Sequence, residues 1–75
     1  MSEKAREALK NIVRAAERTE DGYVMQVEIP ARDSDERRRI CTELTARGCI
    51  SSVEPYGRNY IRCQVERIAY SYLED

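Results

Sequence analysis

Histidine and tryptophan are absent from the 75 residues of this chain, and the lack of histidine excludes several kinds of chemistry. A Ser-His-Asp triad, a Cys-His pair and a zinc site with imidazole ligands all need that side chain. Proton transfer near neutral pH also loses its usual carrier. The sequence has no glycine-rich phosphate loop either. We therefore expect that the protein is not an enzyme and that it binds neither a metal nor a cofactor.

Cysteines are few, and their spacing fits neither a disulfide framework nor a structural zinc site. Cys41, Cys49 and Cys63 are separated by 8 and 14 residues, and no two of them form a C-x-x-C pair. An odd number of cysteines in a small chain favours reduced thiols and an intracellular protein. We expect them to act as small buried hydrophobes.

Long apolar runs are also missing. The first residues are polar and carry charges of both signs, which is not typical of a secretory signal. No apolar run approaches the roughly 20 residues that a bilayer-spanning helix needs. The sequence therefore predicts a cytoplasmic protein that does not bind a membrane.

Charged residues are abundant, at 36% of the chain, and the net charge is −1. With the short length, this predicts one small domain over residues 1–75 with a thin core and a large surface. The net charge does not indicate a polybasic binder. The distribution is uneven, however, because residues 31–67 contain eight arginines and six acids. This segment is where we look for a binding surface.

The spacing of apolar residues predicts six elements in the order αβαββα, and so an α+β fold. Ser2 is expected to cap the first helix, and Asp33, followed by Glu36 three residues later, the second. Gly48 is the expected end of the second helix. The predicted elements are a helix over 2–18, a strand over 23–29, a helix over 34–47, a hairpin over 49–65 and a short helix over 66–74.

Alternation along the strands predicts which side chains enter the core. In the first strand these are Tyr23, Met25, Val27 and Ile29. A hairpin turn at residues 55–58 gives the facing pairs Glu54 with Asn59, Ser52 with Ile61 and Ile50 with Cys63. Cys49 and Cys63 then lie on opposite faces, which forbids a disulfide between them. With the first strand beside the last, the three-stranded antiparallel sheet has the order 2-3-1 and packs on the helices.

From Glu43 to Asp75 the sequence reads ELTARGCISSVEPYGRNYIRCQVERIAYSYLED. A helix ends at a glycine, an apolar strand follows, a polar turn comes next, and a closing helix carries aliphatic and aromatic residues near a leucine. The residues that carry this pattern are Leu44, Gly48, Ile50, the turn at 55–58, Ile61, Val65, Ile68, Tyr72 and Leu73. The pattern resembles the recognition-helix-plus-wing half of small bacterial winged-helix regulators. The resemblance implies a winged-helix-like fold that binds DNA. Only residues 30–34 are available for the separate helix that precedes the recognition helix in that family.

A second architecture fits the same order of elements. Residues 23–75 give βαββα and are similar to a truncated ferredoxin-like unit, as in small regulatory ligand-binding domains, without its last strand. The helix at 2–18 is then an addition. This arrangement leaves an exposed sheet edge, which favours dimerisation.

Two groups of arginines are the candidate nucleic-acid-binding residues. Arg38 and Arg39 lie in the early turns of the second helix, where they could reach phosphate or guanine. Arg58 lies at the hairpin tip, and Tyr60 and Arg62 share the outward face of the hairpin, where an aromatic ring beside arginines can stack on bases. The alternative for the helix is a solvated face paired with nearby acids. The alternative for the hairpin is a structural role in which Tyr60 packs on Val53.

The leading hypothesis from the sequence is a small winged-helix-like module that binds DNA as an accessory protein or regulator. Arg38, Arg39, Arg58 and Arg62 would contact phosphates, and Tyr60 would support them. The alternative is a protein-binding or homodimerising module, an adaptor or inhibitor, without nucleic-acid binding. It would use the outer face of the hairpin together with Tyr56, Tyr70 and Tyr72, because tyrosine is enriched in protein interfaces.

Overall fold

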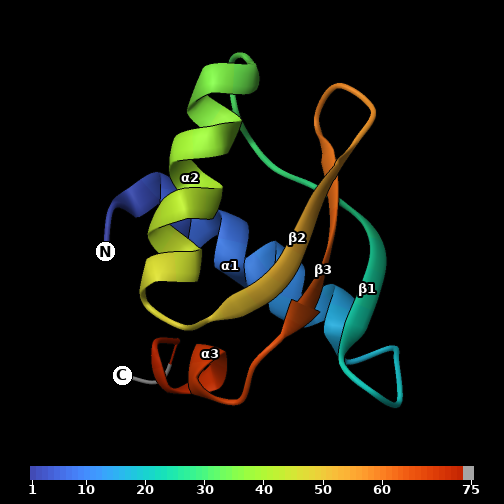
Figure 1. Ribbon diagram of the computed structural model, residues 1–75. Helices are drawn as coiled ribbons and strands as arrows, with labels where there is room; N and C mark the ends of the chain where they lie inside the picture. Colours follow the sequence, from blue (N-terminus) through green and yellow to red (C-terminus); the bar gives the residue numbers. More distant parts are fainter. Residues whose placement is uncertain (74–75) are drawn as a thin grey trace.

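Six elements follow one another in the predicted order αβαββα in the computed structural model, which describes residues 1–73 (Figure 1). They are α1 (Glu3–Ala16), β1 (Tyr23–Glu28), α2 (Ser34–Ala46), β2 (Ile50–Tyr56), β3 (Tyr60–Val65) and α3 (Ile68–Ser71). The strands form an antiparallel sheet in the order β1-β3-β2, which confirms the predicted α+β fold and strand order. The predicted end of the last helix, residue 74, lies outside the described residues.

The helices and the sheet form two layers. Figure 1 shows α1 crossing behind the sheet and α2 standing beside β2, while α3 follows β3 at the lower end. The core lies between these layers, where Ile61, Cys63 and Val65 of β3 are buried. The other side of the sheet carries no helix within residues 1–73. Residues 29–33, which connect β1 to α2, form no helix.

The buried residues of α1 form one apolar stripe along the helix. Leu9 and Ile12 are fully buried, and the hydroxyl of Ser2 caps the helix by accepting a hydrogen bond from the backbone N–H of Ala5 at 3.2 Å. Three small residues, Ala5, Ala8 and Ala16, let the helix lie close to its neighbours. This helix supplies much of the core, because its buried face packs against β1 and α2.

Both ends of α2 are fixed by hydrogen bonds that the sequence predicts in part. The carboxylate of Asp33 accepts from the backbone N–H of Glu36 at 2.8 Å, as expected for an N-cap. Glu36 reaches back one residue further than in a capping box, to the backbone N–H of Arg32 at 3.0 Å. At the other end, Gly48 has φ +77°, and the N–H of Cys49 donates to the carbonyl of Leu44, which is a Schellman motif.

The predicted inward face of β1 is wrong at its first half. Val24 is buried, whereas Met25 is 61% exposed. The cause is a bulge, because the pairing with β3 shifts by one residue between Val24 and Val27 and so exchanges the two faces. Val27 and Ile29 are buried as predicted.

The predicted register of the hairpin is also wrong. Strand β2 runs through Pro55 to Tyr56, and the turn lies at residues 57–59 rather than 55–58. The facing pairs are Ile50 with Val65, Glu54 with Arg62, Pro55 with Ile61 and Tyr56 with Tyr60. A bulge at Ser52, which has φ +52°, adds one residue to β2. Proline is tolerated inside this strand because β2 lies at the edge of the sheet.

Cysteine side chains take the place of small hydrophobes in the core. Cys49 and Cys63 are fully buried, Cys41 is half-buried, and all three are free thiols. The prediction that Cys49 and Cys63 lie on opposite faces is wrong, because Cys49 precedes β2 and enters the core as the last residue of the Schellman motif. Within residues 1–73, none of the helices combines the length and the apolarity that a membrane crossing requires.

Truncation of Ile61 tests the core. Ile61 is 1% exposed and lies at the centre of the sheet, so Ile61→Ala is expected to lower the free energy of unfolding by about 2–5 kcal/mol. Urea unfolding followed by circular dichroism measures this loss. The control is Ile68→Ala at a position 47% exposed, where we expect a loss of about 0.5 kcal/mol or less. Equal losses in the two variants would contradict this placement of the core.

Candidate functional site

Arg37 connects the beginning of α2 to the tip of the β2–β3 hairpin. Its Nη1 donates to the carbonyl oxygen of Gly57 at 3.0 Å and also to the carbonyl oxygen of Arg58. Apolar packing does not hold the hairpin tip, because residues 56–58 are exposed. A charged donor to two carbonyls is a strong link. It holds the turn against the first turns of α2.

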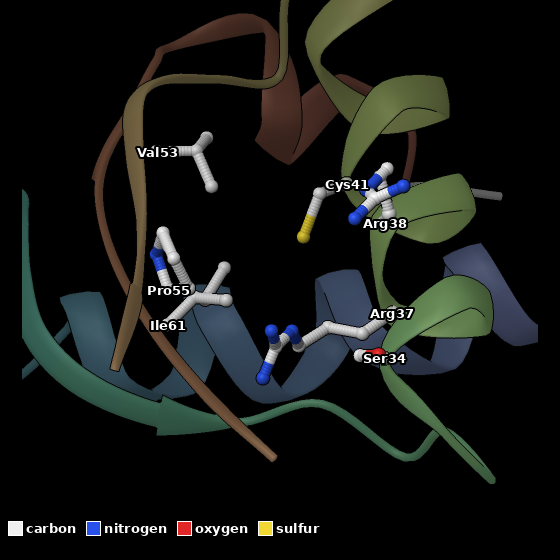
Figure 2. A pocket seen from close by; sticks show the side chains of 7 residues that line it. All are labelled: Ser34, Arg37, Arg38, Cys41, Val53, Pro55 and Ile61. Carbon is white, nitrogen blue, oxygen red and sulfur yellow. The ribbon is translucent and has the colours of Figure 1, made fainter. Parts of the chain in front are cut away.

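Between α2 and the hairpin this link leaves a hollow surface, which we call the α2–hairpin groove. Its centre is a cavity of about 190 Å³, drawn in Figure 2. The groove continues past the cavity toward the hairpin tip on one side and along α2 on the other. The cavity is lined by Ser34, Arg37, Arg38, Cys41, Val53, Pro55 and Ile61. The continuations add Arg32, Asp33, Gly57 and Arg58 at the tip and Thr42, Thr45 and Ala46 along α2.

Positive charge predominates in the groove. Its lining contains four arginines and one acid, Asp33, whose carboxylate is engaged as the N-cap of α2. Arg38 lies 4.0 Å from Asp35, but both side chains are more than 70% exposed, so water weakens this ion pair. The positive end of the α2 dipole lies at the same end of the groove. The arrangement suits an anion.

Glu36 lies on the other side of α2 and is neutralised there. Its carboxylate accepts from Nζ of Lys4 at 2.7 Å, and from the backbone N–H and Nε of Arg32, each at 3.0 Å. The hydrogen bond from Lys4, followed by the one from the Arg32 backbone, lowers the pKa of Glu36 from 4.5 to about 2. This carboxylate therefore ties α1 to the start of α2, and it partly engages the charge of Arg32.

The structure brings together two of the five residues that the sequence analysis selected. Arg38 lines the cavity, and Arg58 lines the groove at the hairpin tip. Arg39 lies on the opposite side of α2, beside Ser2 and Lys4 at the start of α1. The helix geometry explains the separation, because consecutive residues differ by about 100° around the axis.

Tyr60 and Arg62 share the outward face of the hairpin, as predicted. This face of the sheet points away from the helices. We call it the outer sheet face. Tyr60 pairs there with Tyr56 across the hairpin, and the guanidinium carbon of Arg62 lies 4.8 Å from the centre of the Tyr56 ring. The expected packing of Tyr60 on Val53 is wrong, because the bulge in β2 turns Val53 toward the groove.

Two residues of the groove, Arg32 and Arg37, were not selected from the sequence. The bonds of Arg37 reach carbonyls 20 and 21 residues away, so they leave no local signal in the sequence. Arg32 lies in the connection before α2, where periodicity gives no information.

Comparison of the chain with protein-family models, with curated proteins and with solved structures gives no match. Among residues 1–73, no group of three or more cysteines and acids is placed to hold a metal ion.

Neutralisation of Glu36 should appear in the pH dependence of stability. Because the pKa of Glu36 is lower in the folded chain, its ionised carboxylate stabilises the fold above about pH 4.5, and this contribution is lost as the pH falls toward about 2. Glu36→Gln is therefore expected to lower the urea midpoint at neutral pH, and the difference from wild type should vanish near pH 2. The control Glu20→Gln removes a carboxylate from the exposed loop after α1. A Glu36→Gln difference that stays constant with pH would refute this role.

Proposed function

We propose that this chain is a small DNA-binding module, acting as an accessory protein or regulator, and that the α2–hairpin groove contacts DNA phosphates. The observation that carries the proposal is the link from Arg37 to the hairpin tip. It places Arg58 of the hairpin and Arg38 of α2 along one groove, together with Arg32. In the terms of the winged-helix resemblance, α2 is the recognition helix and the β2–β3 hairpin is the wing.

Each arginine contributes differently to phosphate binding. Arg38 is 78% exposed, and within residues 1–73 its guanidinium makes one long ion pair, so it is available to a phosphate. Arg58 is exposed at the hairpin tip. Arg32 is also exposed but shares its charge with Glu36. Arg37 uses Nη1 to hold the hairpin carbonyls, so in DNA binding we assign it to positioning the wing. The groove therefore offers three phosphate contacts, from Arg32, Arg38 and Arg58.

The overall charge of −1 limits this binding to modest affinity, supported by local charge alone. Each neutralised phosphate contributes about −0.9 to the slope of log affinity against log salt. Three contacts therefore predict a slope of about −2.7, which is a loss of roughly 40-fold between about 50 and about 200 mM salt.

Fluorescence anisotropy with labelled random-sequence duplex DNA tests the proposal. The wild type is expected to bind with micromolar affinity at low salt and to show this slope. Replacing Arg38 and Arg58 together by glutamine should abolish measurable binding or reduce the slope to about −1, since two of three phosphate contacts are lost. The matched control replaces Arg39 and Arg62 by glutamine, which removes the same charge from two other surfaces.

Two results would reject the groove as the DNA site. One is the absence of binding by the wild type at low salt. The other is an equal loss of affinity in the Arg38/Arg58 and Arg39/Arg62 variants, because this would assign the binding to overall charge rather than to the groove.

A second candidate function, self-association, is favoured by the outer sheet face. No helix covers this face within residues 1–73, and it presents Tyr23, Tyr56 and Tyr60 beside Arg62, residue types that are enriched in protein interfaces. Arg62 stands opposite Glu54 on the same face. A two-fold interface uses the same patch twice, so a patch that carries both charges can pair with its own copy.

Sedimentation equilibrium with two charge-reversed variants tests this candidate. The wild type should dimerise at high micromolar concentration, whereas Arg62→Glu and Glu54→Arg should each remain monomeric because like charges then face each other. An equimolar mixture of the two variants should dimerise again. Arg39→Glu, with its charge on the other side of α2, should behave as the wild type. A monomeric wild type at several hundred micromolar would dismiss the candidate.

A further inference from the structure

The cavity at the centre of the groove has an apolar wall on its hairpin side. Val53, Pro55 and Ile61 form this wall, and Figure 2 shows them facing α2 across the cavity. The sulfur of Cys41 points into the same space from α2. Burial raises the pKa of the Cys41 thiol above its ordinary value, so the thiol stays protonated and adds no negative charge. The wall therefore suits an uncharged apolar group.

The opposite side of the cavity is cationic. Figure 2 shows the side chain of Arg37 reaching from α2 across the cavity toward the hairpin. Its two bonds to the hairpin carbonyls use Nη1 and fix the plane of the guanidinium, while Nε and Nη2 donate to no acceptor among the described residues. Arg38 and the hydroxyl of Ser34 lie on the same side. Arg38 forms an ion pair with Asp35 at 4.0 Å, and this pair lies largely in water.

We propose that this cavity binds a small carboxylate with a compact apolar or aromatic body. The carboxylate would lie against Arg37 and Arg38, whose planar donor forks match its geometry, and the body would lie against Val53, Pro55 and Ile61. An inorganic anion would leave the apolar wall exposed to water, and a neutral ligand would leave the guanidiniums without a counter-charge. The site does not require that the groove bind DNA.

Its size indicates the ligand class. A cavity of about 190 Å³ is somewhat larger than the engineered cavity of about 150 Å³ that takes up benzene. One aromatic ring with one carboxylate therefore fills it. Benzoate is the simplest probe of this kind. Benzamide has the same shape without the charge, and acetate has the charge without the ring.

Titration of the ¹⁵N-labelled protein with the three probes, followed by amide chemical shifts, tests the site. Benzoate is expected to give saturable shifts confined to residues 34–41 and 53–61. Benzamide and acetate should bind at least tenfold more weakly, because each lacks one half of the interaction. Arg38→Gln should weaken benzoate binding by about two- to fivefold, as expected for an exposed charge partner.

A matched pair of variants separates the cavity from the helix surface. Cys41→Met places a longer side chain inside the cavity and should abolish saturable benzoate binding. Thr45→Met places the same side chain one turn further along α2, in the continuation of the groove, and should leave it unchanged. The amide spectrum of each variant shows whether it is folded.

The proposal is overturned if benzoate gives no saturable shifts, or if Cys41→Met and Thr45→Met bind it equally well. Equal binding of benzoate and benzamide would also overturn it, since the guanidiniums would then play no part. Because these titrations contain no DNA, their failure is distinct from a failure of the proposed DNA binding.

Discussion

The hydrogen bonds from Arg37 to the tip of the β2–β3 hairpin fix the relation between the hairpin and the helical layer. The rest of the hairpin is held by its pairing with β1 and by the core below Ile61, but the tip extends beyond that core. Arg37 holds the tip in place of apolar packing. Its stem lies over the groove, and its charged end donates hydrogen bonds to two backbone carbonyls. The cavity and the row of arginines lie between α2 and the hairpin, the two elements that this link joins.

Two surfaces with different chemistry result from the two-layer arrangement. The α2–hairpin groove is concave and cationic, with an apolar wall. The outer sheet face is open, contains tyrosines, and carries Arg62 stacked on Tyr56. The bulge at Ser52 separates them, since it directs Val53 and Pro55 to the groove and Glu54 and Tyr56 to the outer sheet face. A β2 strand without this extra residue would exchange those side chains and change both surfaces.

The spacing of apolar residues was sufficient to predict the elements, because α1 and α2 each carry their buried apolar residues along one side of the helix. It failed at the bulges, since Val24 and Met25 of β1, like Ser52 and Val53 of β2, are compatible with either face when read locally. The candidate site was predictable in the same limited sense. Arg38 and Arg58 were recognised as exposed cations, but their common groove, and the separation of Arg39 and Arg62 from it, depend on the pairing of distant segments.

The sequence by itself determined the αβαββα order, the caps of both long helices, the strand order and the absence of histidine chemistry, because each follows from local spacing or from composition. The tertiary structure alone decided the register of both strand pairs, the placement of Arg37 between helix and hairpin, and the cavity beside it. The physical reason is that an equally good local pattern permits several pairings, both within the hairpin and between segments 20 or more positions apart, and only the packing of the whole core selects one.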